Sequence, residues 1–93
     1  MIIIFNYHYV RDHYKYEYEG IKGISLDRFK KHINYLASNC NFISINDLQS
    51  DKFLELFTNK DLNIIITFDD GLSEQFINCL PTLNYYNIKP TFF

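Results

Sequence analysis

Apolar residues along this chain gather in short runs, and polar segments separate the runs. The runs at Ile2–Tyr7 and Leu62–Phe68 are rich in β-branched and aromatic residues that do not alternate with polar ones. Such runs are typical of strands in a parallel sheet that is covered on both faces. Shorter runs at Phe42–Ile45 and after Pro90 predict two further strands.

Helical spacing of apolar residues predicts two helices before the Leu62–Phe68 strand. Ser25 is a suitable N-cap for the first helix, which is expected to end near Ser38 and Asn39. Its apolar stripe consists of Leu26, Phe29, Ile33 and Leu36. Asn46 or Asp47 is expected to cap the second helix. That helix carries Leu48, Leu54, Leu56 and Phe57.

A third helix is expected from Ser73 to Tyr86, with Pro81 inside it. Its predicted inner face consists of Phe76, Ile77, Leu80 and Leu83. A proline within a helix costs about 3 kcal/mol, so a kink or a helix restart is expected there. Asn87 suits the left-handed position after the helix. Strands thus alternate with helices, which predicts an α/β fold with a parallel sheet.

Composition narrows the classes of function. The chain has 93 residues, of which 47% are hydrophobic, enough for one small core. A net charge of −2 provides no basic surface, which argues against nucleic acid as a partner. The two cysteines, Cys40 and Cys79, form no Cys-x-x-Cys motif and are expected to be buried apolar residues.

No membrane span is expected, because no apolar run approaches the roughly 20 residues that a span needs. The N-terminal sequence also lacks the basic and small-residue features of a signal peptide, which predicts a cytoplasmic chain. A leader lost from the sequence would instead indicate a secreted or envelope-associated protein. At the other end, Phe92 and Phe93 stop within an apolar strand, so we expect the N-terminal part of a longer domain.

Two adjacent carboxylates, Asp69 and Asp70, end the most apolar strand and precede Gly71. Functional sites of α/β folds lie at the carboxyl ends of strands, where one carboxylate can bind a metal while the other acts as a base. The alternative is a simple Asp-Gly turn, or capping of the next helix by Asp70. An Asp-x-Asp phosphatase motif is excluded by Gly71, and no calcium loop of the EF-hand type is present.

Other residues near the predicted site have less specific signals. His8 follows the first strand on the same edge of the sheet as Asp69 and could line a substrate cleft, or could be an ordinary strand-end histidine. His13 and His32 are expected to be solvated. Tyrosines in the segment 14–19 could stack on sugar rings or lie in an exposed loop. Thr67 could form a hydrogen bond near the site, although a strand threonine needs no such role.

The Asp-Asp-Gly sequence and its flanking residues make the chain similar to the polysaccharide deacetylases, that is, the NodB-homology domain of carbohydrate esterase family 4. Thr67 to Gly71 match the family motif "TFDDG" in full. The family's "LPxL" helix, "YNI" turn and "PxTFF"-like strand resemble Leu80–Leu83, Tyr86–Ile88 and Lys89–Phe93. Upstream similarities are "YHYV" at 7–10, "FKKHINYL" at 29–36 and "FISINDL" at 42–48. The resemblance covers nearly the whole chain.

The resemblance implies that residues 1–93 are the N-terminal part of a distorted (β/α) barrel. The resemblance also implies an enzyme that removes acetyl groups from N-acetylated sugars or polysaccharide, which hydrolyses a non-peptide carbon–nitrogen bond. Some members of the family remove O-acetyl groups instead. Asp70 is then a ligand of a divalent metal ion, with zinc as the expected ion, together with two histidines from a later His-x-x-x-His-type motif. Asp69 is then the catalytic base, and the polysaccharide or amino sugar is the partner.

The sequence departs from the family because it lacks the histidine motif and the later segments that supply an arginine, a second aspartate and a general-acid histidine. Its histidines are His8, His13 and His32, so no His-x-x-x-His motif occurs. We therefore expect the 93-residue chain alone not to catalyse deacetylation. Two further hypotheses stay open: a truncated, non-catalytic carbohydrate-binding remnant, and a small structural domain with an Asp-Asp-Gly turn.

Overall fold

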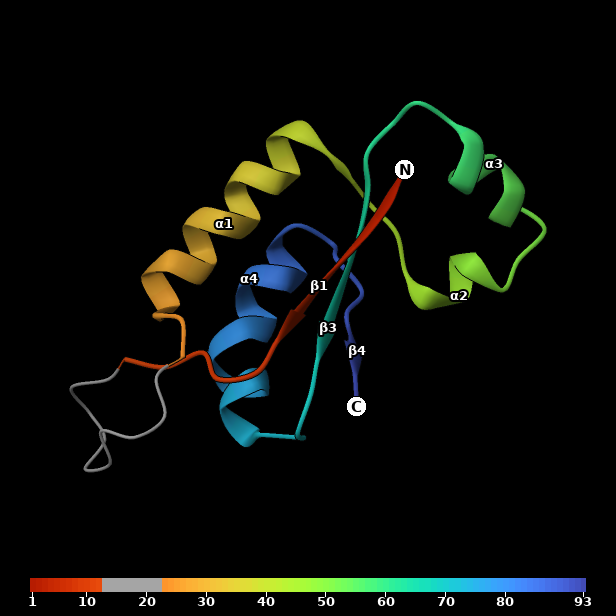
Figure 1. Cartoon of the computed structure of the whole chain (residues 1–93). Helices are drawn as coiled ribbons and strands as arrows, with labels where there is room; N and C mark the ends of the chain where they lie inside the picture. Colours follow the sequence, from red (N-terminus) through yellow and green to blue (C-terminus); the bar gives the residue numbers. More distant parts are fainter. Residues whose placement is uncertain (13–22) are drawn as a thin grey trace.

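The fold is described by a computed structural model, which covers residues 1–12 and 23–93. Parallel strands alternate with helices along the chain (Figure 1). The elements are β1 (Ile2–Tyr7), α1 (Leu26–Asn39), β2 (Asn41–Phe42), α2 (Ile45–Leu48), α3 (Phe53–Thr58), β3 (Asn63–Phe68), the π-helical turn η2 (Gln75–Cys79), α4 (Leu80–Tyr85) and β4 (Thr91–Phe92). The predicted α/β class with a parallel sheet is confirmed.

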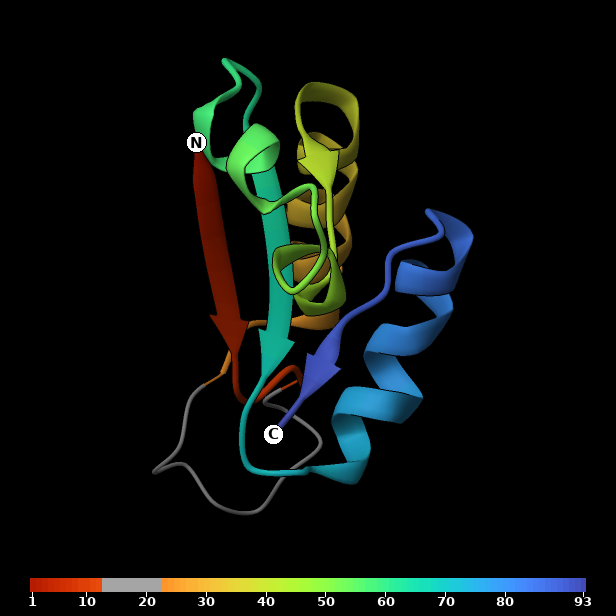
Figure 2. The same ribbon diagram turned by 90° about the vertical axis from the view of Figure 1, so that its right-hand side faces the viewer.

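β3 is the central strand of a four-stranded parallel sheet. β1 pairs with it over the full length, from Ile2 opposite Asn63 to Tyr7 opposite Phe68. β2 and β4 pair with β3 as well, β2 near its beginning and β4 near its end. Consequently β1, β3 and β4 point the same way and end close together (Figure 2).

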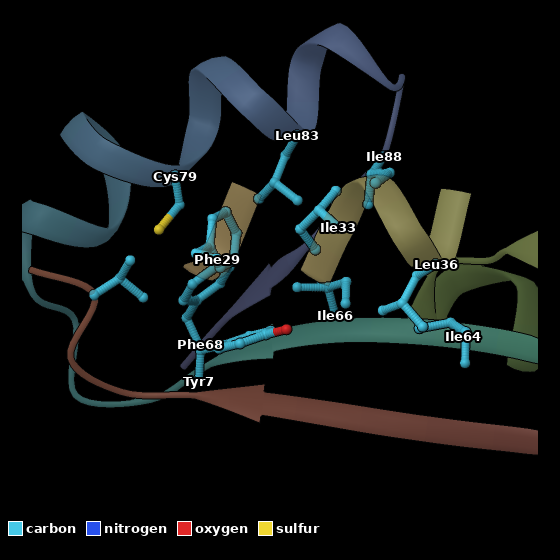
Figure 3. Packing of buried hydrophobic residues seen from close by; sticks show 11 residues of the cluster. Tyr7, Phe29, Ile33, Leu36, Ile64, Ile66, Phe68, Cys79, Leu83 and Ile88 are labelled. Atoms are coloured by element: carbon cyan, nitrogen blue, oxygen red, sulfur yellow. The ribbon is translucent and has the colours of Figure 1, made fainter. Parts of the chain in front are cut away.

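One face of the sheet packs against α1, η2 and α4, while α2 and α3 lie on the other side (Figures 1 and 2). The core lies between the sheet and the first group of helices, where side chains from both layers point toward one another (Figure 3). The cluster consists of Tyr7, Val10, Phe29, Ile33, Leu36, Ile64, Ile66, Phe68, Cys79, Leu83 and Ile88. This packing fixes the ends of β1 and β3 relative to each other.

The two long strands differ in burial. Every residue of β3 is buried, as predicted for a strand with both faces covered. The same prediction is wrong for β1, where Ile4 is 55% exposed. Among the described residues, β1 pairs with β3 alone, and nothing covers the side of the strand on which Ile4 lies. The apolar composition of β1 therefore does not mean that both faces of this strand are covered.

α1 begins and ends where the sequence predicts. The Ser25 hydroxyl accepts a hydrogen bond from the Arg28 N–H at 3.2 Å and caps the helix. The predicted stripe faces the core, with Phe29, Ile33 and Leu36 buried. Cys79 is buried as predicted, whereas Cys40 is only partly buried.

The segment after α1 departs from the prediction. The strand is shorter than expected, and Ser44, not Asn46 or Asp47, is the N-cap of α2, in a capping box with Asp47. The single predicted helix is two helices, broken between Leu48 and Phe53. Ser50 explains the break, because its hydroxyl donates to the Asp47 carbonyl at 2.7 Å and accepts from the Lys52 N–H.

The helix after Gly71 has an inner face that differs in part from the predicted one. Leu83 is buried as predicted and Leu80 is partly buried, whereas Phe76 and Ile77 are exposed, Ile77 to 73%. Cys79, which was not part of the predicted face, is buried in the core. The cause is η2, whose wider turn rotates the face that meets the core. η2 ends just before Pro81, so the expected irregularity at this proline is confirmed. Asn87 has a φ of 55°, as predicted for the left-handed position.

Candidate active site

The candidate site lies where β1 and β3 end. Because Tyr7 pairs with Phe68, the next residues of the two strands, His8 and Asp69, are neighbours. The His8 Nε2 lies 3.4 Å from the Asp69 Oδ2, and the two side chains are 48% and 37% exposed. The predicted placement of His8 beside Asp69 is therefore confirmed, and both side chains can reach a ligand from solvent.

The backbone of Asp69 is held at both ends of the residue. Its N–H donates to the Tyr7 carbonyl at 3.0 Å, which extends the pairing of the two strands. Its carbonyl accepts from the Gln75 Nε2 at 2.5 Å, and the same Nε2 donates to the His8 carbonyl at 2.9 Å. Gln75 is fully buried, so one side chain joins the two loops that carry the site.

Asp70 and Gly71 form a tight turn in left-handed backbone conformation. Their φ angles are 77° and 57°. For a non-glycine residue such as Asp70 this conformation costs about 1–2 kcal/mol, and strain of this kind concentrates at functional sites. The Asp70 side chain is exposed and has no hydrogen-bond partner in residues 1–12 or 23–93. The turn alternative thus describes the backbone correctly, whereas helix capping by Asp70 is not observed in that part of the chain.

Polar side chains from η2 and the residue before it anchor the loop that follows β1. The Glu74 carboxylate accepts from the Val10 N–H at 3.1 Å and from the Arg11 Nε at 3.0 Å, and also binds the Arg11 Nη2. The Asn78 Nδ2 donates to the Val10 carbonyl at 2.8 Å. The Arg11 guanidinium lies 4.4 Å from the centre of the Tyr9 ring. These contacts fix the loop in which His8 lies.

Asn6, Glu74 and Gln75 are not among the residues predicted for the site. The possible hydrogen bond of Thr67 near the site is confirmed, because its hydroxyl donates to the Asn6 Oδ1. Asn6 contacts the Asp69 carboxylate directly, with its Nδ2 2.9 Å from the Asp69 Oδ2. A signal existed, because Asn6 is the one amide in an otherwise apolar and aromatic strand. Glu74 and Gln75 carry no such signal, since polar residues are common in the first turn of a helix.

His32 lies away from the site, and the prediction that it is solvated is wrong. The Tyr7 hydroxyl forms a hydrogen bond with the His32 Nδ1, and the Phe5 ring packs edge-on against the imidazole. Burial raises the pKa of Tyr7 and lowers the pKa of His32, which favours the neutral form of both side chains in this hydrogen bond. His13 and the tyrosines of segment 14–19 lie outside the described residues.

Three further observations concern metal ligands, membrane spans and the Cys79 thiol. In the described part of the chain, no group of three or more His, Cys, Asp and Glu residues is close enough to hold a metal ion. Within that same part, no helix has the length and apolar character required to cross a membrane. The Cys79 thiol is no candidate nucleophile, because burial, together with Glu74, raises its pKa to about 12.

Solved deacetylases share this fold. A de-N-acetylase from Aggregatibacter actinomycetemcomitans superposes on 98% of the chain with a TM-score of 0.75 and 24% identity. The Streptococcus pyogenes deacetylase PplD, solved in complex with acetate, superposes on 98% with a TM-score of 0.68 and 17% identity. A Bacillus anthracis protein gives a TM-score of 0.61 and 22% identity over 98% of the chain.

These likenesses establish the fold, and they agree with the resemblance drawn from the "TFDDG" motif. The chain spans 36%, 40% and 28% of the lengths of the three solved proteins. No protein-family model and no curated protein sequence matches the chain. The fold is therefore that of a part of a deacetylase barrel.

Proposed function

We propose that residues 1–93 are the N-terminal part of a metal-dependent hydrolase that removes acetyl groups from N-acetylated sugars or polysaccharide. The observation that carries the proposal is the position of Asp69 and Asp70 at the carboxyl end of β3, in a fold shared with solved deacetylases. The bond broken is a non-peptide carbon–nitrogen bond. The substrate partner is the polysaccharide or amino sugar itself.

Asp69 is the general base of the proposed reaction. Its carboxylate is partly exposed, so water and substrate can approach it, while the Tyr7 and Gln75 contacts hold its backbone. A positioned carboxylate that removes a proton from the attacking water contributes about 10²–10⁴-fold to a hydrolysis rate. His8, next to Asp69 and more open to solvent, lines the substrate cleft in this proposal.

The described residues do not by themselves form a metal site. Asp70 offers one exposed carboxylate, and no third ligand lies close to Asp69 and His8 in that part of the chain. A catalytic zinc needs three protein ligands and an open position. The metal part of the proposal, with zinc as the preferred ion, therefore belongs to a longer chain in which Asp70 contributes one ligand.

The incomplete donor set favours one alternative, a non-catalytic carbohydrate-binding remnant. Both interpretations predict no tight zinc binding by the 93-residue chain alone, so absence of binding in calorimetry would not separate them. A micromolar zinc site found in the chain would contradict the remnant hypothesis.

The decisive test of the proposed function is an activity assay on the product of the whole reading frame. Acetate release from N-acetylglucosamine oligomers is measured with and without zinc, and then for Asp69→Asn and Asp70→Asn. The proposal expects metal-dependent release that both substitutions reduce by at least about 100-fold. Release that survives both substitutions would show that the two carboxylates are not part of the site.

A further inference from the structure

Asn6 lies between Thr67 and Asp69 in a chain of side-chain hydrogen bonds. The Thr67 Oγ1 donates to the Asn6 Oδ1 at 2.9 Å, and the Asn6 Nδ2 donates to the Asp69 Oδ2 at 2.9 Å. The parallel register explains the geometry, because Asn6 of β1 is the partner of Thr67 of β3. Asn6 therefore reaches the strand end that carries Asp69.

Thr67 fixes the orientation of the Asn6 amide. Thr67 is only 4% exposed, so its hydroxyl depends on a partner within the protein. With the Asn6 oxygen occupied by this donor, the amide NH₂ is directed toward the carboxylate. A hydrogen bond to a charged acceptor is about twice as strong as one between neutral groups, which favours a single arrangement.

The two oxygens of the Asp69 carboxylate have different surroundings. Oδ2 accepts from Asn6 and lies 3.4 Å from the His8 Nε2. Oδ1 forms no hydrogen bond with any residue of the described ranges 1–12 and 23–93. Since the backbone on either side of Asp69 is also held, by Tyr7 and Gln75, the contact with Asn6 decides which oxygen faces outward.

We propose that Asn6 is a positioning residue, which holds Oδ2 of Asp69 so that Oδ1 is the oxygen that accepts the proton. This inference rests on the proposed role of Asp69 as the base. The step assigned to Oδ1 is a single proton transfer. An O–H bond of the attacking water breaks, its electron pair remains on the water oxygen, and the proton bonds to Oδ1, leaving a neutral carboxyl group.

The side-chain amide of Asn6 gives a direct spectroscopic test in the 93-residue chain by NMR. In the unsubstituted protein we expect one Nδ2 proton to be shifted downfield, because it is donated to a carboxylate. Asp69→Asn replaces the charged acceptor with a neutral one, so this proton should move upfield. A substitution that merely destabilised the fold would not shift a single amide proton in this way.

Thr67→Val provides the second variant, since valine keeps the shape of threonine and removes the hydroxyl. The amide then loses its fixed orientation, and the downfield signal of Asn6 should disappear. Thr58→Val is the matched control, because the Thr58 hydroxyl donates to the Leu54 carbonyl on α3, away from the site. It should leave the Asn6 signal unchanged.

An Asn6 signal that is insensitive to both Asp69→Asn and Thr67→Val would overturn the positioning role. This outcome would leave the deacetylase proposal intact, because the NMR experiment uses no substrate and no metal. Conversely, absence of acetate release from the product of the whole reading frame would refute the proposed function while the Asn6 signal was still present. The two failures are therefore distinguishable.

Discussion

Replacing Glu74 with glutamine tests how firmly the loop after β1 is held against the helix that follows Asp69. The Glu74 carboxylate accepts from the Val10 N–H and the Arg11 Nε, and it also binds the Arg11 Nη2. The Arg11 and Glu74 side chains are only 18% and 13% exposed. Glutamine keeps the shape and one acceptor oxygen, but it removes the charge and directs an NH₂ group toward these donors.

The cost follows from the contacts. Hydrogen bonds to a charged group each contribute about 1.5–3 kcal/mol, and breaking a buried ion pair costs about 3–5 kcal/mol. Because the Glu74 pair keeps some contact with solvent and glutamine keeps one acceptor, we expect Glu74→Gln to lower the free energy of unfolding by about 2–3 kcal/mol. The matched control is Asp27→Asn, which breaks the exposed Asp27–Lys31 pair at 3.0 Å. Its effect should stay within about 0.5 kcal/mol.

Urea unfolding followed by circular dichroism gives both free energies. Hydrogen exchange at the Val10 N–H provides a local measurement, since this group donates to Glu74 and should exchange faster in the glutamine variant. Equal free energies for Glu74→Gln and Asp27→Asn would refute the anchoring argument. Unchanged protection of the Val10 amide would do so as well.

Three further predictions concern stability. Leu83→Ala should lower the free energy of unfolding in urea by about 2–5 kcal/mol, and Ile77→Ala by less than about 0.5 kcal/mol, because η2 turns Leu83 inward and Ile77 outward. Similar costs for the two substitutions would contradict this assignment of the buried face. Gly71→Ala should lower the free energy of unfolding by about 1–2 kcal/mol because of the φ of 57° alone, since an added Cβ meets no atom within 4 Å. An unchanged midpoint of urea unfolding would show that alanine is not strained in this turn. Burial lowers the pKa of His32, so the stabilising contribution of the neutral imidazole is complete above the unfolded value of 6.5 and is lost as pH falls through the lower folded value. Thermal unfolding from pH 8 to 5 should show this decline in the unsubstituted protein and a shallower one in His32→Gln; identical slopes would contradict it.

The features predicted correctly are those that local sequence decides. β1 and β3 follow from continuous apolar runs, and α1 follows from its apolar stripe and the Ser25 cap. Asn87 follows from the left-handed conformation that asparagine tolerates after a helix. In each case the residue type and its immediate neighbours carry enough information.

The incorrect predictions depend on tertiary packing or on competing local hydrogen bonds. The inner face of the last helix changes because η2 widens the turn before Pro81, which periodicity at 3.6 residues does not reveal. The break between α2 and α3 depends on hydrogen bonds of Ser50. His32 is partly buried only because α1 brings it against Tyr7 of β1.

Some residues of the candidate site could likewise be predicted from the sequence, and others could not. Asp69 and His8 could be placed together from the sequence, because carboxyl ends of parallel strands meet at one edge of the sheet. Asn6 could not, because its contact with Asp69 depends on the exact register of β1 against β3. The role of Gln75 could not be predicted either, because it depends on η2, which buries this side chain between the two loops.

We propose that Asp69 and Asp70 belong to the site of a metal-dependent deacetylase. The direct test is acetate release from N-acetylglucosamine oligomers by the product of the whole reading frame, with zinc present. We expect release that requires the metal and falls by at least about 100-fold in Asp69→Asn and in Asp70→Asn. No release from that product with any divalent metal, or release that both variants retain, would contradict it.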